Sequence, residues 1–210
     1  MIRIRTILAS LLLFGLFSSA NAALIDNGSY TSDTQTGLDW LDLTETQNKS
    51  YDYVSSQLGT GGLYAGYAYA TSSQFYTLVS NYTGVGAADV FEHDFTEGAD
   101  SIDPLVQLLG NTNTSNSTNS PSLMNSAYGL IADQYDANTH WAALIYDRDE
   151  ASIYNDFSIA EYYRGLANNQ ADVNIGSYLV RQTASIPESP SIFLLALGLL
   201  GLFGVARRKV

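Results

Sequence analysis

The side chains best suited to chemistry in this sequence are two histidines, many carboxylates and abundant hydroxyls, with no cysteine among them. His93 and His140 do not form a motif with each other, and a metal site would need both to converge with carboxylates. His140 opens an apolar segment and is interpreted as structural. Serines are frequent, but none stands in the Gly-x-Ser-x-Gly pattern of a nucleophile elbow. The sequence therefore predicts no catalytic residue and no thiol enzyme.

Two acidic clusters could hold calcium, which binds several oxygen ligands supplied by loops. One recurs every third residue in a glycine-containing loop, and the other is expected as the turn after an apolar strand. The candidate ligands are Asp94, Glu97, Asp100, Asp147, Asp149 and Glu150. Neither cluster follows the twelve-residue EF-hand pattern, so solvated acidic loops are the favoured interpretation. We expect no cofactor, with calcium as the one candidate.

Paired carboxylates could also serve a hydrolase, because glycosidases use two acidic side chains about 5–10 Å apart. Of the 21 acidic residues, all but Glu188 lie between Ala23 and Thr183. The basic residues of that span are Lys49, Arg148, Arg164 and Arg181. The span therefore carries a net charge of about −16, and some carboxylate pair would reach that spacing by chance. Such a surface repels nucleic acid and anionic lipid, which argues against both as partners.

One domain must position these side chains, since residues 23–183 have the usual length of a single domain. Short strands joined by turns are expected from Leu24 to Leu43, with turns at Asp26-Asn27-Gly28 and Thr36-Gly37. Leu38 to Leu43 alternates apolar residues with carboxylates, which predicts at best a half-buried edge strand.

Two helices are expected next. Ser50 can cap a short helix that ends at residues 59–62 and has Tyr51, Val54 and Leu58 on one face. A small strand from Tyr64 to Tyr69 precedes the capping-box spacing Thr71-Ser72-Ser73-Gln74. The helix that follows this box has one apolar stripe, formed by Phe75, Leu78, Val79 and Tyr82.

The second half of the domain is predicted to consist mostly of strands. Asp103-Pro104 starts a brief helix that ends before Gly110. Residues 111–120 are all Asn, Thr or Ser and predict an exposed loop. Strands are expected at 123–131, 140–146 and 174–181, the second being apolar on both faces as in a central strand. The pattern indicates an α+β fold with an antiparallel sheet.

Both ends of the chain indicate export. Residues 1–22 contain Arg3 and Arg5, an apolar run and then Ala20-Asn21-Ala22, which is the pattern of a secretory signal peptide. Cleavage by signal peptidase after Ala22 would leave a mature chain that begins at Ala23. The alternative is a permanent N-terminal anchor.

The segment from Ile192 to Ala206 is apolar and uncharged, and the cations Arg207, Arg208 and Lys209 follow it. Fifteen residues form a helix of roughly 22 Å, short of the roughly 30 Å hydrocarbon core. Snorkelling of the basic side chains closes part of that gap. The positive cluster would stay in the cytoplasm and place the preceding domain outside. The segment is therefore predicted to be a transmembrane helix.

This tail resembles the PEP-CTERM sorting signal of Gram-negative bacteria in three consecutive parts. Pro187-Glu188 comes first, then an apolar segment with repeated Leu-Gly, then Arg-Arg-Lys. The usual Pro-Glu-Pro is Pro187-Glu188-Ser189 here, with Pro190 one place later. The resemblance implies that residues 186–210 are recognised by an exosortase, a membrane transpeptidase-like enzyme. It also implies an inner-membrane stage before release to the cell surface or the exterior.

Short motifs within residues 23–183 carry a second resemblance. They occur in the order Asp26-Asn27-Gly28, Thr36-Gly37-Leu38-Asp39-Trp40-Leu41, Ser50-Tyr51, Gly66-Tyr67-Ala68-Tyr69-Ala70 and Gly176-Ser177-Tyr178-Leu179-Val180-Arg181. This order resembles exported domains that precede PEP-CTERM tails and, more distantly, the Lcl C-terminal domain, which is similar to C-type lectin-like folds. The resemblance implies two helices packed on a twisted antiparallel sheet whose first and last strands lie together.

Three functions are compatible with these patterns. The first is a non-enzymatic exported protein of the cell surface or of the extracellular polysaccharide matrix. The second is a carbohydrate-binding, lectin-like module, and the third is a secreted hydrolase that uses carboxylates. The expected partners are signal peptidase, an exosortase and extracellular polysaccharide, with the membrane contacted through the C-terminal helix.

Overall fold

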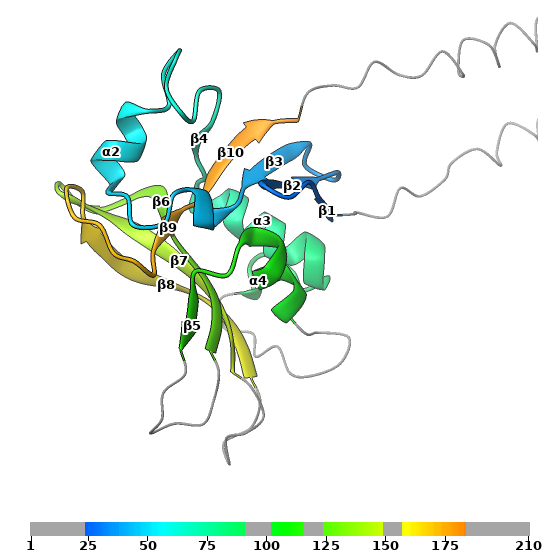
Figure 1. The fold of residues 1–210 in the computed structure, drawn as a ribbon. Helices are drawn as coiled ribbons and strands as arrows, with labels where there is room; N and C mark the ends of the chain where they lie inside the picture. Colours follow the sequence, from blue (N-terminus) through cyan, green and yellow to red (C-terminus); the bar gives the residue numbers. More distant parts are fainter. Residues whose placement is uncertain (1–23, 91–101, 116–123, 149–156, 184–210) are drawn as a thin grey trace, which may run out of the picture.

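The computed structural model describes residues 24–90, 102–115, 124–148 and 157–183 of the chain. It has the α+β architecture that the sequence predicts, but its strands form two sheets in place of one (Figure 1). The predicted signal peptide and the predicted transmembrane helix lie outside the described residues. Every helix within the described ranges is too short or too polar to cross a lipid bilayer.

The first sheet, called sheet A, contains the first three strands and the last one. β1 (Leu24–Asp26), β2 (Tyr30–Asp33) and β3 (Leu38–Leu41) form an antiparallel meander, as expected for this stretch. β10 (Leu179–Gln182) pairs with β3 on one side and with β4 (Ala68–Tyr69) on the other. The first and last strands thus share a sheet, although β3 and not β1 is the neighbour of β10.

Both predicted turns of the meander are present. Gly28 has a φ of 86° and donates its N–H to Asp26 Oδ1 at 2.7 Å. Gly37 has a φ of 67° and donates its N–H to the carbonyl of Asp33 at 2.8 Å. Positive φ angles favour glycine because a Cβ atom would clash there, so the two glycines fix where the strands reverse.

β3 is an interior strand, so the prediction of a half-buried edge is wrong. All four of its residues are buried. Leu38 and Trp40 pack into one core on one face, and Leu41 packs into a second core on the other. Asp39 is buried as well, because hydrogen bonds from neighbouring strands satisfy its carboxylate.

The second sheet, called sheet B, is built around two long strands. β5 (Asn113–Ser115), β6 (Met124–Asp136), β7 (Thr139–Arg148) and β8 (Phe157–Ala167) are antiparallel neighbours in that order. β9 (Gly176–Ser177) pairs with β6 in parallel. β7 lies between β6 and β8, which confirms the central strand predicted for residues 140–146.

Three sequence predictions of strands and loops need correction. The expected strand at 64–69 is reduced to β4, because Gly66 adopts a φ of 88° and interrupts it. The tract at 111–120 is not all exposed loop: Thr112 is buried, and residues 113–115 form β5. Here the Thr112 hydroxyl donates to the carbonyl of Ser126 at 3.1 Å, so a polar tract pairs with β6. The single strand expected at 174–181 is two strands, β9 and β10, in different sheets.

The helices begin where the sequence predicts. α2 (Tyr51–Ser56) is capped by Ser50, but it ends before Leu58 and follows a short 3-10 turn, η1 (Leu43–Glu45). α3 (Ser72–Thr83) begins with the predicted capping box of Thr71 and Gln74. The apolar stripe of α3 faces the core, with its central residues buried. α4 (Asp103–Leu109) has proline in its first turn and ends at Gly110.

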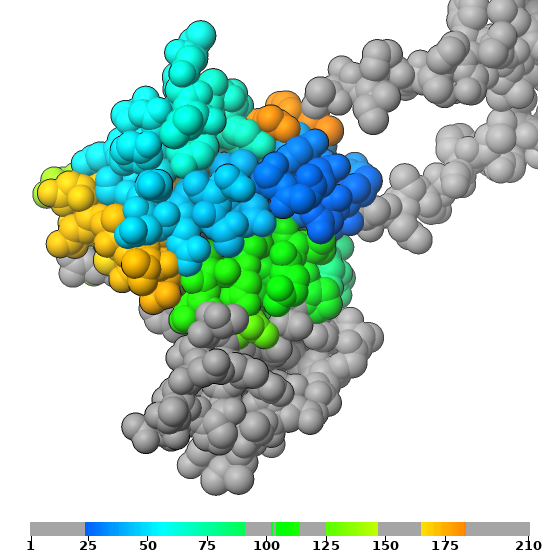
Figure 2. All heavy atoms as spheres, viewed as in Figure 1, coloured from blue at the N-terminus to red at the C-terminus, as the bar shows by residue number. Residues whose placement is uncertain are grey.

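Two apolar cores flank sheet A. The larger core joins β3 and β10 to β6, β7, α3 and α4, and it includes Trp40, Phe75 and Tyr178. The smaller core joins Leu41 and Leu179 to Val54 of α2 and to Leu130 and Ala142 of sheet B. One face of sheet A is therefore covered by α3 and α4, while the other is covered only in part, beside α2. Figure 2 shows the atoms of α4, in green, directly below those of the first strands, in blue.

Tyr178 lies where the chain passes from sheet B to sheet A. Its N–H donates to the carbonyl of Leu130 in β6 at 2.9 Å, and its carbonyl accepts from the N–H of Ala70 at 2.8 Å. Its side chain is buried, and its hydroxyl donates to the carbonyl of Ala127 at 2.9 Å. The ring meets Trp40 and Phe75 edge-on. One residue thus links both sheets and the core of α3.

We expect Tyr178→Phe to lower the free energy of unfolding by about 0.5–1.5 kcal/mol, because the buried hydrogen bond from the Tyr178 hydroxyl to the carbonyl of Ala127 would be lost. Urea unfolding measures this change. Tyr53→Phe is the matched control, since Tyr53 is exposed, and it should change stability by no more than about 0.5 kcal/mol. Equal stabilities for the two variants would contradict the role given to the Tyr178 hydroxyl.

Candidate functional site

Of the site residues predicted from sequence, Asp147 alone belongs to the part of the chain that the structure describes. The others lie outside it: Asp94, Glu97, Asp100, Asp149, Glu150, Pro187, Glu188, Ser189, Pro190, Arg207, Arg208 and Lys209. The prediction that a turn begins at Asp147 is wrong, because β7 continues through Arg148 and pairs Asp147 with Asn125 and Ser158. Among the described residues, no three of His, Asp or Glu are grouped so as to hold a metal ion.

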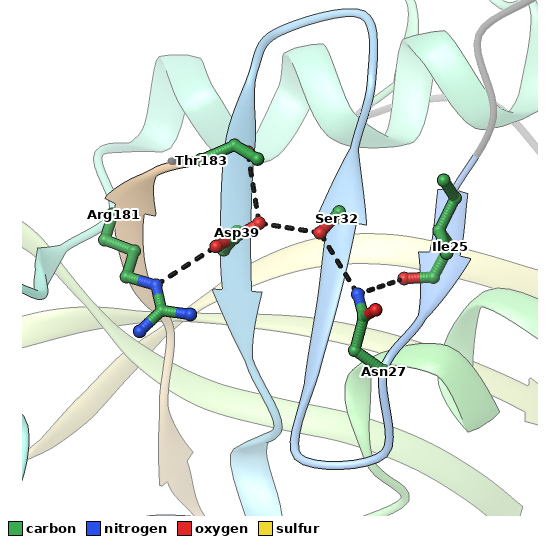
Figure 3. A network of polar contacts seen from close by, with 6 residues as sticks. All are labelled: Ile25, Asn27, Ser32, Asp39, Arg181 and Thr183. Atoms are coloured by element: carbon green, nitrogen blue, oxygen red, sulfur yellow. Dashed lines mark hydrogen bonds and ion pairs between the residues drawn. The ribbon is translucent and has the colours of Figure 1, made fainter. Parts of the chain in front are cut away.

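A polar network crosses sheet A on the face opposite α3 (Figure 3). Its centre is Asp39, whose Oδ2 accepts from Arg181 Nε at 3.0 Å. Asp39 Oδ1 accepts from the hydroxyls of Ser32 at 2.6 Å and Thr183 at 3.0 Å. Asn27 extends the network by donating to Ser32 Oγ at 3.1 Å. The network thus ties β3 to β2 and to β10.

The strand register places these side chains on one face. Asp39 is directly opposite Ser32 of β2 and opposite Arg181 of β10. Side chains of directly opposed residues lie on the same side of an antiparallel sheet. The next residues along the three strands point to the opposite face, and all are buried: Thr31, Trp40 and Val180. Of these, Trp40 and Val180 pack into the larger core with α3 and α4.

The environment of Asp39 stabilises its charged form. Burial alone would raise the pKa of this carboxyl, but hydrogen bonds from Ser32, Arg181 and Thr183 and the charge of Arg181 lower it more. The pKa of Asp39 therefore lies below its ordinary value, and the pair with Arg181 is ionic at neutral pH. Because the two opposite charges cancel, the Arg181–Asp39 pair does not present a net positive charge to a ligand.

Arg181 is also held between two tyrosines. The centre of its guanidinium lies 4.9 Å from the ring centroid of Tyr30 and 4.7 Å from that of Tyr67. Cations within about 6 Å of an aromatic centroid are attracted to the ring face. Burial raises the pKa of Tyr67, so its hydroxyl keeps its proton. The Arg181 side chain remains 37% exposed, so a ligand can reach it. The candidate site, called the Arg181 cluster, consists of Arg181, Asp39, Tyr30 and Tyr67.

A separate aromatic stack connects α2 to both sheets. The ring of Tyr51 lies 3.6 Å from that of His140 in β7 and 4.1 Å from that of Tyr69 in β4, nearly parallel to each. His140 is buried and its Nδ1 lies 2.9 Å from Asn168 Oδ1. Burial raises the pKa of Tyr69, whose hydroxyl lies 3.2 Å from Ser177 Oγ. These contacts give His140 a packing role, in line with its interpretation from sequence.

Sequence reasoning did not identify Arg181, Tyr30 or Tyr67 as site residues. The available signal was Arg181 itself, a lone cation within the apolar strand Leu179–Gln182 of a strongly acidic domain. Its partners could not be found from spacing, because Tyr30, Asp39 and Tyr67 come from distant parts of the chain. The pairing of β10 with β3 on one side and with β4 on the other brings them to Arg181.

Comparisons of the chain with protein-family models, with curated proteins and with solved structures find no match. The fold and the site therefore define a class only: a two-sheet α+β domain with an Arg–Asp pair and an aromatic sandwich on the open face of one sheet.

We expect the stability that depends on Asp39 to be lost in acid. Because its pKa is lowered by folding, its contribution is present above the ordinary carboxyl pKa of about 3.9 and declines as pH falls below it. Asp39→Asn should lower the free energy of unfolding by about 1.5–3 kcal/mol at neutral pH. The gap from wild type should shrink toward pH 3.

Urea unfolding across this pH range measures the gap. Asp52→Asn removes an exposed carboxylate and controls for the change in net charge. A gap between wild type and Asp39→Asn that stays constant from pH 7 to pH 3 would show that the charge of Asp39 contributes nothing.

Proposed function

We propose that this is a non-enzymatic exported protein of the cell surface or extracellular matrix of a Gram-negative bacterium. The carrying observation is the order of sequence signals: a signal peptide at 1–22, an acidic domain at 23–183 and a PEP-CTERM-like tail at 186–210. Signal peptidase and an exosortase process its two ends. The apolar segment at 192–206, predicted from sequence to be a transmembrane helix, holds it in the inner membrane before release.

The layout of the folded domain is compatible with a tether at its C-terminal side. The described chain begins in β1 and ends just after β10, and both strands belong to sheet A. The turn between β6 and β7 lies at the far end of the domain from the ends of these strands (Figure 1). A tether after β10 would therefore leave that end of sheet B free to meet material outside the cell.

A second candidate is a carbohydrate-binding module. The observation that favours it is the Arg181 cluster, which presents hydrogen-bond donors between aromatic rings on an open sheet face. This candidate is compatible with the first, because a surface or matrix protein lies among polysaccharides.

The exported protein should begin at Ala23, because Ala20 and Ala22 supply the small side chains that signal peptidase requires. N-terminal sequencing of the protein recovered outside the cytoplasm measures this. Retention of Arg3 or Arg5 in that protein would mean that the segment is a permanent anchor.

Leu199→Arg should release the domain into the soluble fraction, because a charge at a helix centre costs roughly 2.5–3.5 kcal/mol on insertion. Asn116→Ala is the control and should leave the protein with the membrane. If an exosortase acts, a C-terminal fragment should be lost near residues 187–191, and Glu188→Ala should reduce that loss. Fractionation and intact mass report both results. A wild-type protein that is soluble with Val210 still attached would contradict the sorting proposal.

A further inference from the structure

The guanidinium of Arg181 is fixed from three directions. Asp39 holds Nε at 3.0 Å, and the rings of Tyr30 and Tyr67 lie on either side at 4.9 and 4.7 Å. A planar group held in this way is already ordered, so a ligand does not have to immobilise a long side chain. This distinguishes Arg181 from an ordinary surface arginine.

The donors that remain on Arg181 are free to bind a ligand. An arginine has five N–H donors, and one of them, on Nε, is used by Asp39. No described residue accepts a hydrogen bond from either terminal nitrogen. Figure 3 shows these nitrogens directed away from Asp39. The hydroxyls of Tyr30 and Tyr67 likewise make no hydrogen bond to a described residue, so they can both donate and accept.

The charge balance selects the kind of ligand. Asp39 neutralises Arg181 locally, and the surrounding domain carries a net charge of about −16. An anion would meet a neutral pair inside a repulsive field, whereas an uncharged ligand would not be repelled. The free groups are mainly donors, so the ligand must offer closely spaced oxygen acceptors. Adjacent hydroxyls of a sugar offer such oxygens, and the fork of two terminal nitrogens suits a pair of them.

We infer that Arg181, Tyr30 and Tyr67 form a binding site for adjacent hydroxyls of a neutral sugar. Arg181 donates from both terminal nitrogens, and the two tyrosine hydroxyls complete the contacts. Asp39 does not touch the sugar and acts by positioning Arg181. The inference deepens the carbohydrate-binding candidate and does not depend on the sorting tail. Failure of binding would leave the fractionation result intact.

The test is calorimetric titration of the full-length protein in detergent with cellotetraose, maltotetraose, mannotetraose and tetragalacturonate. At least one of the three neutral oligosaccharides should bind, with an affinity that changes little between low and high salt. Arg181→Lys keeps the charge but removes the planar fork, and it should weaken binding about tenfold or more. Tyr67→Phe keeps the ring but removes the hydroxyl, and it should weaken binding by about threefold or more.

Lys49→Gln is the matched control, because Lys49 is a cation that lies 5.6 Å from the ring centroid of another tyrosine, Tyr53. The Lys49→Gln variant should bind the oligosaccharide with the affinity of wild type. Thermal unfolding of each variant separates lost binding from lost folding, and Tyr67→Phe tests the site even if Arg181→Lys is poorly folded. The inference is overturned if no neutral oligosaccharide binds or if Arg181→Lys and Tyr67→Phe bind as wild type does. Salt-sensitive preference for tetragalacturonate would equally overturn it, by showing an anion site.

Discussion

The rest of the structure depends on Tyr178, the residue shared by the two sheets. Its N–H belongs to the hydrogen bonding of sheet B, and its carbonyl to that of sheet A. Its ring fills the space between them, and Gly129 leaves room for it, since a Cβ there would lie 2.9 Å from Tyr178 Cδ2. Because the chain changes sheets within one residue, the orientation of β10 follows from that of β9. The site on sheet A is therefore built on a strand whose position is set in sheet B.

The two faces of sheet A differ in polarity, and β3 contributes a buried residue to each of them. Trp40 is buried on the side of α3, although its indole Nε1 has no hydrogen-bond acceptor within the described residues. A buried donor without an acceptor costs about 1–3 kcal/mol, which the packing of so large a ring offsets. On the other side, Asp39 is buried with all of its charge compensated. The consecutive residues Asp39 and Trp40 of β3 thus face opposite sides of the sheet, one in a polar network and the other in an apolar core.

The sequence predicted correctly those features that depend on interactions between residues close together in the chain. The turn at Gly28, the capping box at Thr71 and the apolar stripe of α3 depend on residues close in sequence, and all are present. The interior position of β3 and the division of 174–181 into two strands depend on which distant strands pair, and the sequence does not encode that locally. β8 was missed because its residues mix apolar and charged types without clear alternation. The Arg181 cluster was not predicted either, because it forms only when β10 pairs with β3 and β4, which are distant from it in sequence.

The position of β10 also has a mechanical consequence. It is flanked by β3 and β4, so a force that pulls on the chain after Thr183 must break hydrogen bonds to two neighbours at once. The Arg181–Asp39 pair and the hydrogen bond from Thr183 N–H to the carbonyl of Gly37 at 2.8 Å add resistance at the point where tension enters. β1, by contrast, lies at an edge of sheet A and pairs there with β2. Tension from the N-terminal side would peel a three-residue strand, whereas tension from the C-terminal side would have to shear the middle of the sheet.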